Sequence, residues 1–130
     1  MHHGGEPTLQ KALPDFLSQI KELDYHIKLD TNGSRPQIIK ALWENHLIDK
    51  VAMDIKTSKA SYPLLTGLDY VNLEDICESI EFLMSCGIDY EFRTTVVREL
   101  HQSEDFLSIS QWLAGAKAYF LQAYQTRKKS

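Results

Sequence analysis

The chain has 130 residues, 43% of them hydrophobic, and its 14 basic and 18 acidic residues give a net charge of -4. This length suits one domain, residues 1–130, with a modest core, and the charge argues against nucleic acid or an anionic membrane surface as the main partner. The two cysteines, Cys77 and Cys86, make no disulfide framework, and neither a signal peptide nor a membrane-spanning apolar run is evident, so we expect a cytoplasmic protein.

The first predicted elements are a helix, a strand and a second helix. Pro14 begins a helix whose apolar residues recur at three- and four-residue spacing, and this face should cover a sheet. A strand over 26–29 then leads into the polar turn 30–34, and Pro36 begins a helix over 36–45. The apolar face of the first helix consists of Leu13, Phe16, Leu17, Ile20 and Leu23.

A second strand and a third helix follow. The strand over 50–53 ends in the polar cluster 54–56, and the connection over 57–71 is long enough to be a lid or substrate loop. Asn72 caps the clearest helix in the chain, and Cys77 is expected on the buried face of that helix.

Charged and apolar residues alternate along a third predicted strand over 90–97. Inside a parallel sheet this alternation suggests a barrel whose interior is polar near its mouth, whereas an edge strand with one solvated face is the alternative. The alternating residues are Phe92, Thr94 and Val96 against Glu91, Arg93 and Thr95.

The last predicted elements are a helix capped by Ser103 and ended by Gly115, and a strand over 119–122. Helices and strands thus alternate along the whole chain. Because such crossovers are right-handed, the order predicts an α/β fold with parallel strands, either open or curled as part of a barrel.

Polar side chains gather at the carboxyl ends of these strands, where a parallel sheet binds its ligands. A mixture of carboxylates with Lys56 and Arg93 suits a zwitterionic ligand, because the acids attract an amine and the cations bind a carboxylate. No nucleophile, histidine and acid arrangement, phosphate loop or dinucleotide fingerprint is evident. The converging residues are Glu6, Asp30, Thr31, Asn32, Asp54, Lys56, Arg93, Thr95 and Gln122.

Four segments resemble, in order and spacing, the radical S-adenosylmethionine (SAM) superfamily. The resemblance is closest to the activating proteins of anaerobic ribonucleoside-triphosphate reductase, relatives of the pyruvate formate-lyase activating enzyme, and it covers nearly the whole chain. Gly-Gly-Glu alone would be a weak signal, whereas four ordered motifs are a strong one. The segments are Gly4-Gly5-Glu6-Pro7-Thr8-Leu9-Gln10, Lys28-Leu29-Asp30-Thr31-Asn32-Gly33-Ser34, Val51-Ala52-Met53-Asp54-Ile55-Lys56 and Tyr90-Glu91-Phe92-Arg93-Thr94-Thr95-Val96-Val97.

This resemblance implies an incomplete (β/α)6 barrel, a partial TIM barrel with parallel strands, that binds SAM across its mouth. The segment 4–6 would bind the amino group of the methionine part, and Lys56 and Arg93 would lie near its carboxylate. Asp30 and Asp54 would hold a monovalent cation. The implied SAM-binding residues are Gly4, Gly5, Glu6, Asp30, Thr31, Asn32, Lys56 and Arg93.

Members of this family are oxidoreductases that cleave SAM reductively at a [4Fe-4S] cluster, and the resulting radical abstracts hydrogen from a glycine of the partner enzyme. The implied partner is the glycyl-radical enzyme anaerobic ribonucleoside-triphosphate reductase. In the family, three cysteines of a CxxxCxxC loop upstream of Gly-Gly-Glu bind the cluster, and this sequence does not contain that motif. Cys77 and Cys86 cannot replace it.

We therefore expect an amino-terminally truncated domain that lacks the first strand and the cluster-binding loop. No catalytic residue is assigned, and the chain is expected to be inactive alone, which leaves open whether it is an enzyme. The strand that carries Asp30 would lie at an exposed edge of the sheet and would be apolar on both faces. Such an edge predicts self-association.

Two other functions stay open. The chain is either a non-catalytic remnant or one half of a split gene that binds SAM, a nucleoside or a protein partner. A barrel enzyme that handles phosphates or sugars is disfavoured, because no glycine-rich phosphate loop precedes a helix.

Overall fold

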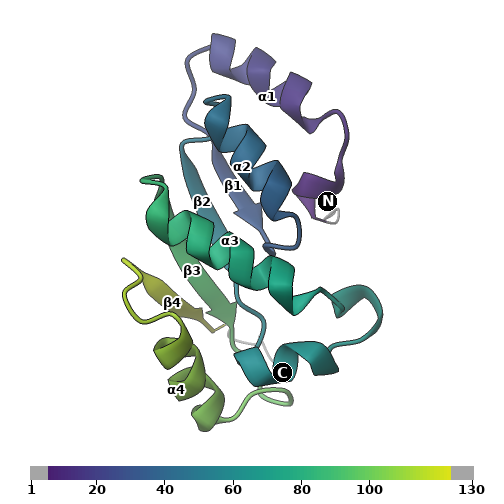
Figure 1. Ribbon diagram of the computed structural model, residues 1–130, viewed down its shortest axis with the longest axis vertical. Coiled ribbons are helices and arrows are strands. Elements are labelled where there is room, and N and C mark those ends of the chain that lie inside the picture. The colour runs from purple at the N-terminus through teal and green to yellow at the C-terminus, as the bar shows by residue number, and fades with distance from the viewer. Residues whose placement is uncertain (1–5, 124–130) are drawn as a thin grey trace, which may run out of the picture.

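Four parallel strands form one sheet in the order β1, β2, β3 and β4, as the computed structural model shows for residues 6–123, which are the residues described below (Figure 1). The strands are β1 (Lys28–Thr31), β2 (Lys50–Asp54), β3 (Asp89–Thr95) and β4 (Tyr119–Gln122). The helices are α1 (Leu13–Glu22), α2 (Pro36–Glu44), α3 (Leu73–Ser85) and α4 (Ser103–Trp112), with short 3-10 helices η1 (Pro7–Leu9), η2 (Lys59–Leu64) and η3 (Gly67–Asp69). The predicted α/β fold with parallel strands is confirmed.

Helices α2 and α3 cross in front of the sheet and cover its apolar face (Figure 1). Alternate residues of each strand point to this face, because successive side chains of a strand point to opposite sides. The burial of Phe92 and Thr94 confirms the alternation predicted for β3. The core between the sheet and the two helices includes Leu29, Val51, Met53 and Phe92 from the strands and Ile39, Leu42, Ile76, Ile80 and Leu83 from the helices.

The opposite face of the sheet is charged. The parallel register aligns β1, β2 and β3 so that their outward residues form one surface. This surface carries Lys28, Asp30, Lys50, Asp54, Glu91 and Arg93. The expectation that the edge strand β1 would be apolar on both faces is wrong, since Lys28 and Asp30 are exposed and only its other two side chains are buried.

Helix α1 lies beside α2 at one end of the molecule (Figure 1). The expected apolar face of α1 is only partly correct, because Leu17 is buried but Phe16 is 59% exposed and Leu23 is 68% exposed. In the part of the chain that the structure describes, no strand lies beyond β1 for these two side chains to cover. Instead, Lys21 in the last turn of α1 forms an ion pair of 2.8 Å with Asp49. This contact lowers the pKa of the Asp49 carboxyl.

Several element boundaries differ from the predictions, among them those of β3, which is Asp89–Thr95 rather than 90–97. Asp30 and Thr31 belong to β1 rather than to a turn, because they pair in register with Ala52 and Met53 of β2. The N-cap of α4 is Gln102 rather than Ser103, and its N–H donates to the Asp105 carboxylate at 2.8 Å.

Helix α3 begins as predicted, since the Asn72 side chain accepts the Glu74 N–H at 2.8 Å. Cys77 is half-buried rather than in the core, because Ile76 and Ile80 occupy the centre of the buried stripe. Among the described residues, no helix is long and apolar enough to cross a membrane.

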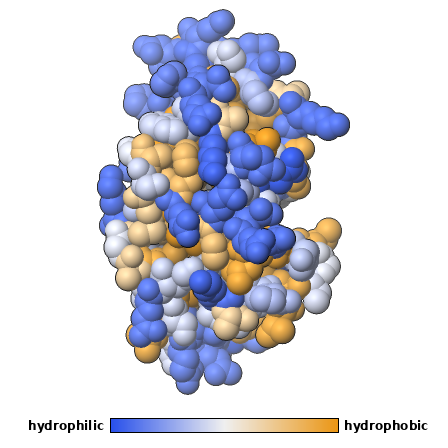
Figure 2. Space-filling model, viewed as in Figure 1, coloured by the Kyte–Doolittle hydropathy of each residue, from blue (hydrophilic) through white to orange (hydrophobic). Residues whose placement is uncertain are grey.

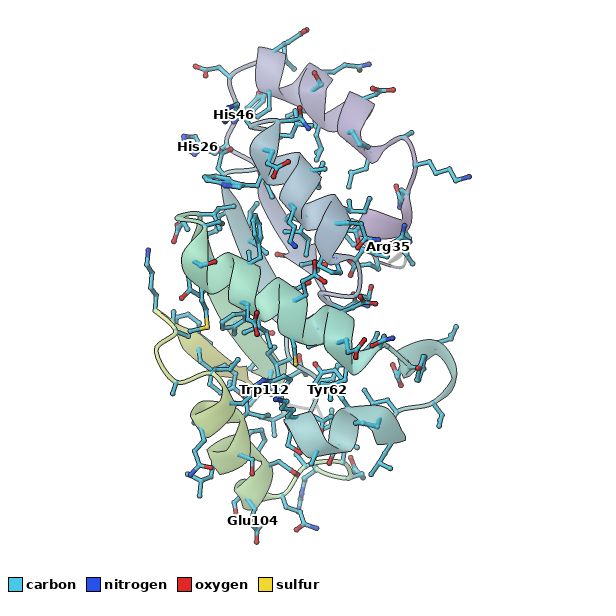
Figure 3. The ribbon with its side chains drawn as sticks, viewed as in Figure 1. His26, Arg35, His46, Tyr62, Glu104 and Trp112 are labelled. Carbon is cyan, nitrogen blue, oxygen red and sulfur yellow. The ribbon has the colours of Figure 1, made fainter. Side chains whose placement is uncertain are left out.

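The connection between β2 and α3 is anchored in its first half. Tyr62 is 1% exposed and meets the Trp112 ring of α4 edge to face at 5.7 Å, and the two rings lie side by side in Figure 3. The second half carries the exposed side chains Leu64, Leu68 and Tyr70. Figure 2 shows hydrophobic residues on the surface where this connection projects.

Gly33 is the tightest position in the turn after β1. Its φ is +78°, and an added Cβ would lie 2.1 Å from the end of the Met53 side chain. Gly87 provides a matched control, because its φ is +95° but nothing lies within 4 Å of an added Cβ.

We expect Gly87→Ala to lower the free energy of unfolding by about 1 kcal/mol through backbone strain alone. Gly33→Ala should cost about 3 kcal/mol, because overpacking against Met53 adds to the same strain. Urea denaturation of both variants measures the difference. Equal losses would show that the Met53 side chain moves aside freely.

Candidate functional site at the carboxyl edge of the sheet

The Glu6 carboxylate accepts hydrogen bonds from three donors, two at the end of β1 and one in η1. It accepts the Asn32 N–H at 2.7 Å and the Thr8 hydroxyl at 2.7 Å, and it also accepts the Thr31 hydroxyl. Thr8 and Thr31 are each 3% exposed. Such charge-assisted hydrogen bonds are stronger than neutral ones, so they fix the segment before η1 against a strand that lies more than twenty residues further along the chain.

The turn after β1 is closed by its own side chains. The Asn32 side-chain oxygen accepts the Ser34 N–H at 2.9 Å, and the Thr31 hydroxyl oxygen accepts the Gly33 N–H at 3.1 Å. The buried Ser79 hydroxyl of α3 then donates to the Gly33 carbonyl at 2.7 Å. This turn is therefore rigid on its own and is also fixed to the helix layer.

Arg93 is the centre of an ion-pair network on the charged face. Its side chain is 15% exposed, and its guanidinium lies 3.5 Å from Asp30, 4.0 Å from Asp54 and 3.8 Å from Glu91. Lys28 lies 3.8 Å from Asp30, and Lys50 lies 3.2 Å from Glu91. The Nε atom of Arg93 is buried and has no hydrogen-bond partner among the described residues.

Asp54 lies where this network meets the edge of the sheet. Burial raises the pKa of its carboxyl, while the positive charges of Arg93 and Lys56 act in the opposite direction. The carboxylates of Asp30 and Glu6 raise the pKa further, because each disfavours another negative charge nearby.

Two cavities of about 220 Å³ each meet at Asp54. The first is called the Lys56 cavity here, and the second the Glu6 cavity. The Glu6 cavity is lined by Glu6, Pro7, Asp30, Thr31, Asn32 and Asp54. The Lys56 cavity is lined by Asp54, Ile55, Lys56, Leu65, Asp69, Thr95, Val97, Leu100 and His101.

The two cavities bring together seven of the residues that the sequence placed at strand ends, namely Glu6, Asp30, Thr31, Asn32, Asp54, Lys56 and Thr95. Arg93 lies behind Asp30 and Asp54 rather than in a cavity wall, and Gln122 lines neither cavity. Gly4 and Gly5 lie outside the described residues.

Sequence reasoning missed Thr8, Tyr62 and His101. Thr8 is two residues from Glu6 in the segment 4–10, and this spacing could have indicated that Thr8 contacts Glu6. Tyr62 lies in the short 3-10 helix η2 and His101 in the loop after β3, and neither segment is long and periodic enough to mark a contacting residue.

A metal site is not evident within residues 6–123, where no group of three or more histidine, cysteine or acidic side chains could hold a metal ion. Asp30 and Asp54 face the Arg93 guanidinium, which supplies positive charge between them. A monovalent cation at these two residues stays a prediction.

Comparison with known proteins defines the class. Residues 1–111 match the family model of the radical SAM superfamily, and the chain belongs to this superfamily. It is 32% identical over 130 aligned positions to the protein of Methanocaldococcus jannaschii named "Putative glycyl-radical enzyme activating enzyme MJ1227", with 95% of this chain and 53% of that protein covered. It is 28% identical over 102 positions to the "Probable GTP 3',8-cyclase" of Thermococcus kodakarensis, with 78% of this chain and 33% of that protein covered. The chain thus spans about half, or a third, of these relatives.

Two solved structures share the fold. A domain of the pyruvate-formate lyase-activating enzyme from Bacteroides vulgatus has a TM-score of 0.70 at 19% identity, covering 90% of this chain and 72% of that domain. TYW1, solved with a lysine-pyruvate adduct bound, has a TM-score of 0.70 at 17% identity, covering 96% of this chain and 41% of that protein. Both agree with a partial barrel of parallel strands.

The superfamily generally implies SAM and an iron–sulfur cluster as cofactors. The residues present fit SAM, because acids, an amide and a lysine line two cavities that share Asp54. They do not fit a cluster held by three thiolates, because the sequence has two cysteines, one in α3 and one at its C-cap.

Replacement of Glu6 tests the three-donor contact. Glu6→Gln puts an amide N–H₂ where the carboxylate accepts hydrogen bonds, so the free energy of unfolding should fall by about 1 to 3 kcal/mol. Thr8→Val removes one of the three donors, so it should lower the free energy of unfolding by less than Glu6→Gln does. Urea denaturation and hydrogen exchange at the Asn32 amide measure both effects, and unchanged protection of that amide in Glu6→Gln would contradict the contact.

Proposed function

We propose that the Glu6 cavity and the Lys56 cavity, which share Asp54, together bind SAM. The segment 4–6 takes the amino group of its methionine part, Lys56 and Arg93 attract its carboxylate, and Asp30, Thr31 and Asn32 line the pocket between them. The observation that carries this proposal is the meeting of the two cavities at Asp54, with the Glu6 carboxylate at one side and the Lys56 ammonium at the other. Opposite charges at a fixed separation suit a zwitterionic amino acid.

The wider activity we propose is that of an activating protein for a glycyl-radical enzyme, the anaerobic ribonucleoside-triphosphate reductase. The four ordered motifs support it, as do the similarity to the M. jannaschii protein and the fold shared with the B. vulgatus domain. SAM bound in such proteins supplies a sulfonium group that is cleaved reductively at an iron–sulfur cluster.

The contribution of this chain is binding and orientation. Its own residues fix the Glu6 segment against β1, hold Asp54 beside Arg93, and place Lys56 at the cavity wall. Because its two cysteines do not fit the cluster, we derive no radical step from these residues. The same observation favours a second candidate, in which the chain is a SAM-binding partner or half that works with a separate polypeptide.

Lys56→Ala tests the assignment of the ligand carboxylate. Removing one charge-assisted contact should weaken SAM binding by about 1 to 3 kcal/mol in isothermal titration calorimetry. Lys59→Ala is a matched control, because Lys59 is an exposed lysine in the same connection that lines neither cavity. Equal affinities of the wild type and Lys56→Ala would remove Lys56 from the site.

Reconstitution tests the radical chemistry. After anaerobic incubation with iron and sulfide, the 130-residue chain should give no stoichiometric [4Fe-4S] signal by electron paramagnetic resonance. It should form no 5'-deoxyadenosine when dithionite and SAM are added, because three converging thiolates are required. Product well above a no-protein control would overturn this expectation. Product restored by a separate polypeptide that carries a CxxxCxxC segment would favour the two-polypeptide candidate.

A further inference from the structure

The peptide groups on both sides of the Lys56 side chain are bound by side chains from other segments. The Lys56 N–H donates to the Tyr62 hydroxyl at 2.8 Å, and the Lys56 carbonyl oxygen lies 2.8 Å from Nε2 of His101. Tyr62 is 1% exposed and His101 is 9% exposed. These two contacts fix the point from which the Lys56 side chain enters its cavity, and neither is made within the regular elements of the sheet.

The contacts of His101 define its protonation state. The Val97 N–H donates to Nδ1 at 2.9 Å, so that nitrogen carries no proton. Nε2 faces a carbonyl oxygen, so it carries the proton. The ring is therefore neutral, and it joins the connection after β2 to the connection after β3. Its ring also packs against Phe106 of α4, with centroids 5.3 Å apart.

We propose that neutral His101 is a positioning residue that links Lys56 to the connection after β3, so that binding of a ligand carboxylate in the Lys56 cavity depends on pH. Protonated His101 still donates from Nε2 to the Lys56 carbonyl, but a proton on Nδ1 would place two N–H groups against each other, and the Val97 contact that completes the link would have to break. The identity of the ligand as SAM rests on the proposed function, whereas the contacts around Lys56 do not.

Charged groups lie in the cavity that His101 lines, in its own loop and at the start of α4. They do not replace either ring contact, because one nitrogen already faces a donor and the other an acceptor. A proton on Nδ1 of His101 therefore breaks the Val97 contact, whatever charged side chains lie nearby. The groups are Asp54, Lys56 and Asp69 in the same cavity, Arg98 and Glu99 in the same loop, and Glu104 and Asp105 at the start of α4.

Calorimetry with SAM on the full 130-residue chain tests the proposal at about pH 8 and about pH 5.5, on either side of the range in which histidine side chains titrate. The wild type should lose about tenfold in affinity at the lower pH, the equivalent of one broken hydrogen bond. His101→Gln keeps a donor toward the Lys56 carbonyl and does not titrate, so it should lose the part of the pH dependence that His101 contributes and keep only the part that comes from Asp54 and from the ligand's amino group. A histidine with a merely structural role would lower the stability of the variant without removing the pH dependence.

A double variant separates action through Lys56 from a direct effect on the ligand. On the Lys56→Ala background, adding His101→Gln should change SAM affinity by less than about twofold. A variant His101→Gln that keeps the wild-type pH dependence, or a further large loss in the double variant, would overturn the proposal.

Nuclear magnetic resonance without ligand gives an independent answer. In ¹⁵N-labelled wild-type chain, Nδ1 of His101 should be unprotonated at about pH 8, and the Lys56 and Val97 amide resonances should move together with its titration. Amides that stay unchanged while His101 titrates would exclude the contact. If SAM fails to bind at either pH, the proposed function is wrong, and these resonances still decide the role of His101.

Discussion

The small residue Ala52 in the middle of β2 is the constraint on which the charged face depends. In the parallel register Ala52 lies between Asp30 of β1 and Glu91 of β3. Arg93 starts from β3 and reaches Asp30, two strands away, so its side chain has to cross β2 at this level. A larger side chain at position 52 would occupy that path, and Ala52 is fully covered, with 0% exposure. The network that holds Asp30 and Asp54 is therefore a consequence of strand register and of one small residue.

Most of the fold was predictable because local patterns and tertiary structure agree. The strand at 50–53, the alternation of buried Phe92 and Thr94 with their neighbours, the Asn72 cap and the helices between strands all appear where the sequence indicates them. The errors lie where tertiary contacts decide. β1 extends through Asp30 and Thr31 because β2 continues to pair with them, although their side chains are typical of a turn.

The candidate site was predictable to a similar degree, and for the same reason. Residues at the carboxyl ends of parallel strands must meet at one edge, so the sequence alone brought Glu6, Asp30, Asp54 and Lys56 together. The partners that orient Lys56 were not predictable, because Tyr62 contacts it from the short 3-10 helix η2 and His101 from the loop after β3. A contact between two such loops depends on how the elements between them pack, which no short-range pattern records.

Arg93 and Lys56 have different roles in the folded chain, although the sequence analysis assigned the same role to both. Arg93 is 15% exposed and lies within 4.0 Å of three carboxylates, so its charge is already shared among residues of the sheet. Lys56 is 36% exposed, and its ion pair with Asp69 is long at 3.9 Å. A carboxylate that enters from the cavity can displace Asp69 from Lys56 at little cost, since exposed pairs of that length contribute little stability. To contact Arg93 directly it would have to compete with three carboxylates at once, and one of them, Glu91, is only 16% exposed. Within the proposed function, Lys56 is therefore the residue that the ligand carboxylate contacts from the cavity, and Arg93 adds its positive charge from behind the acids that it holds in place.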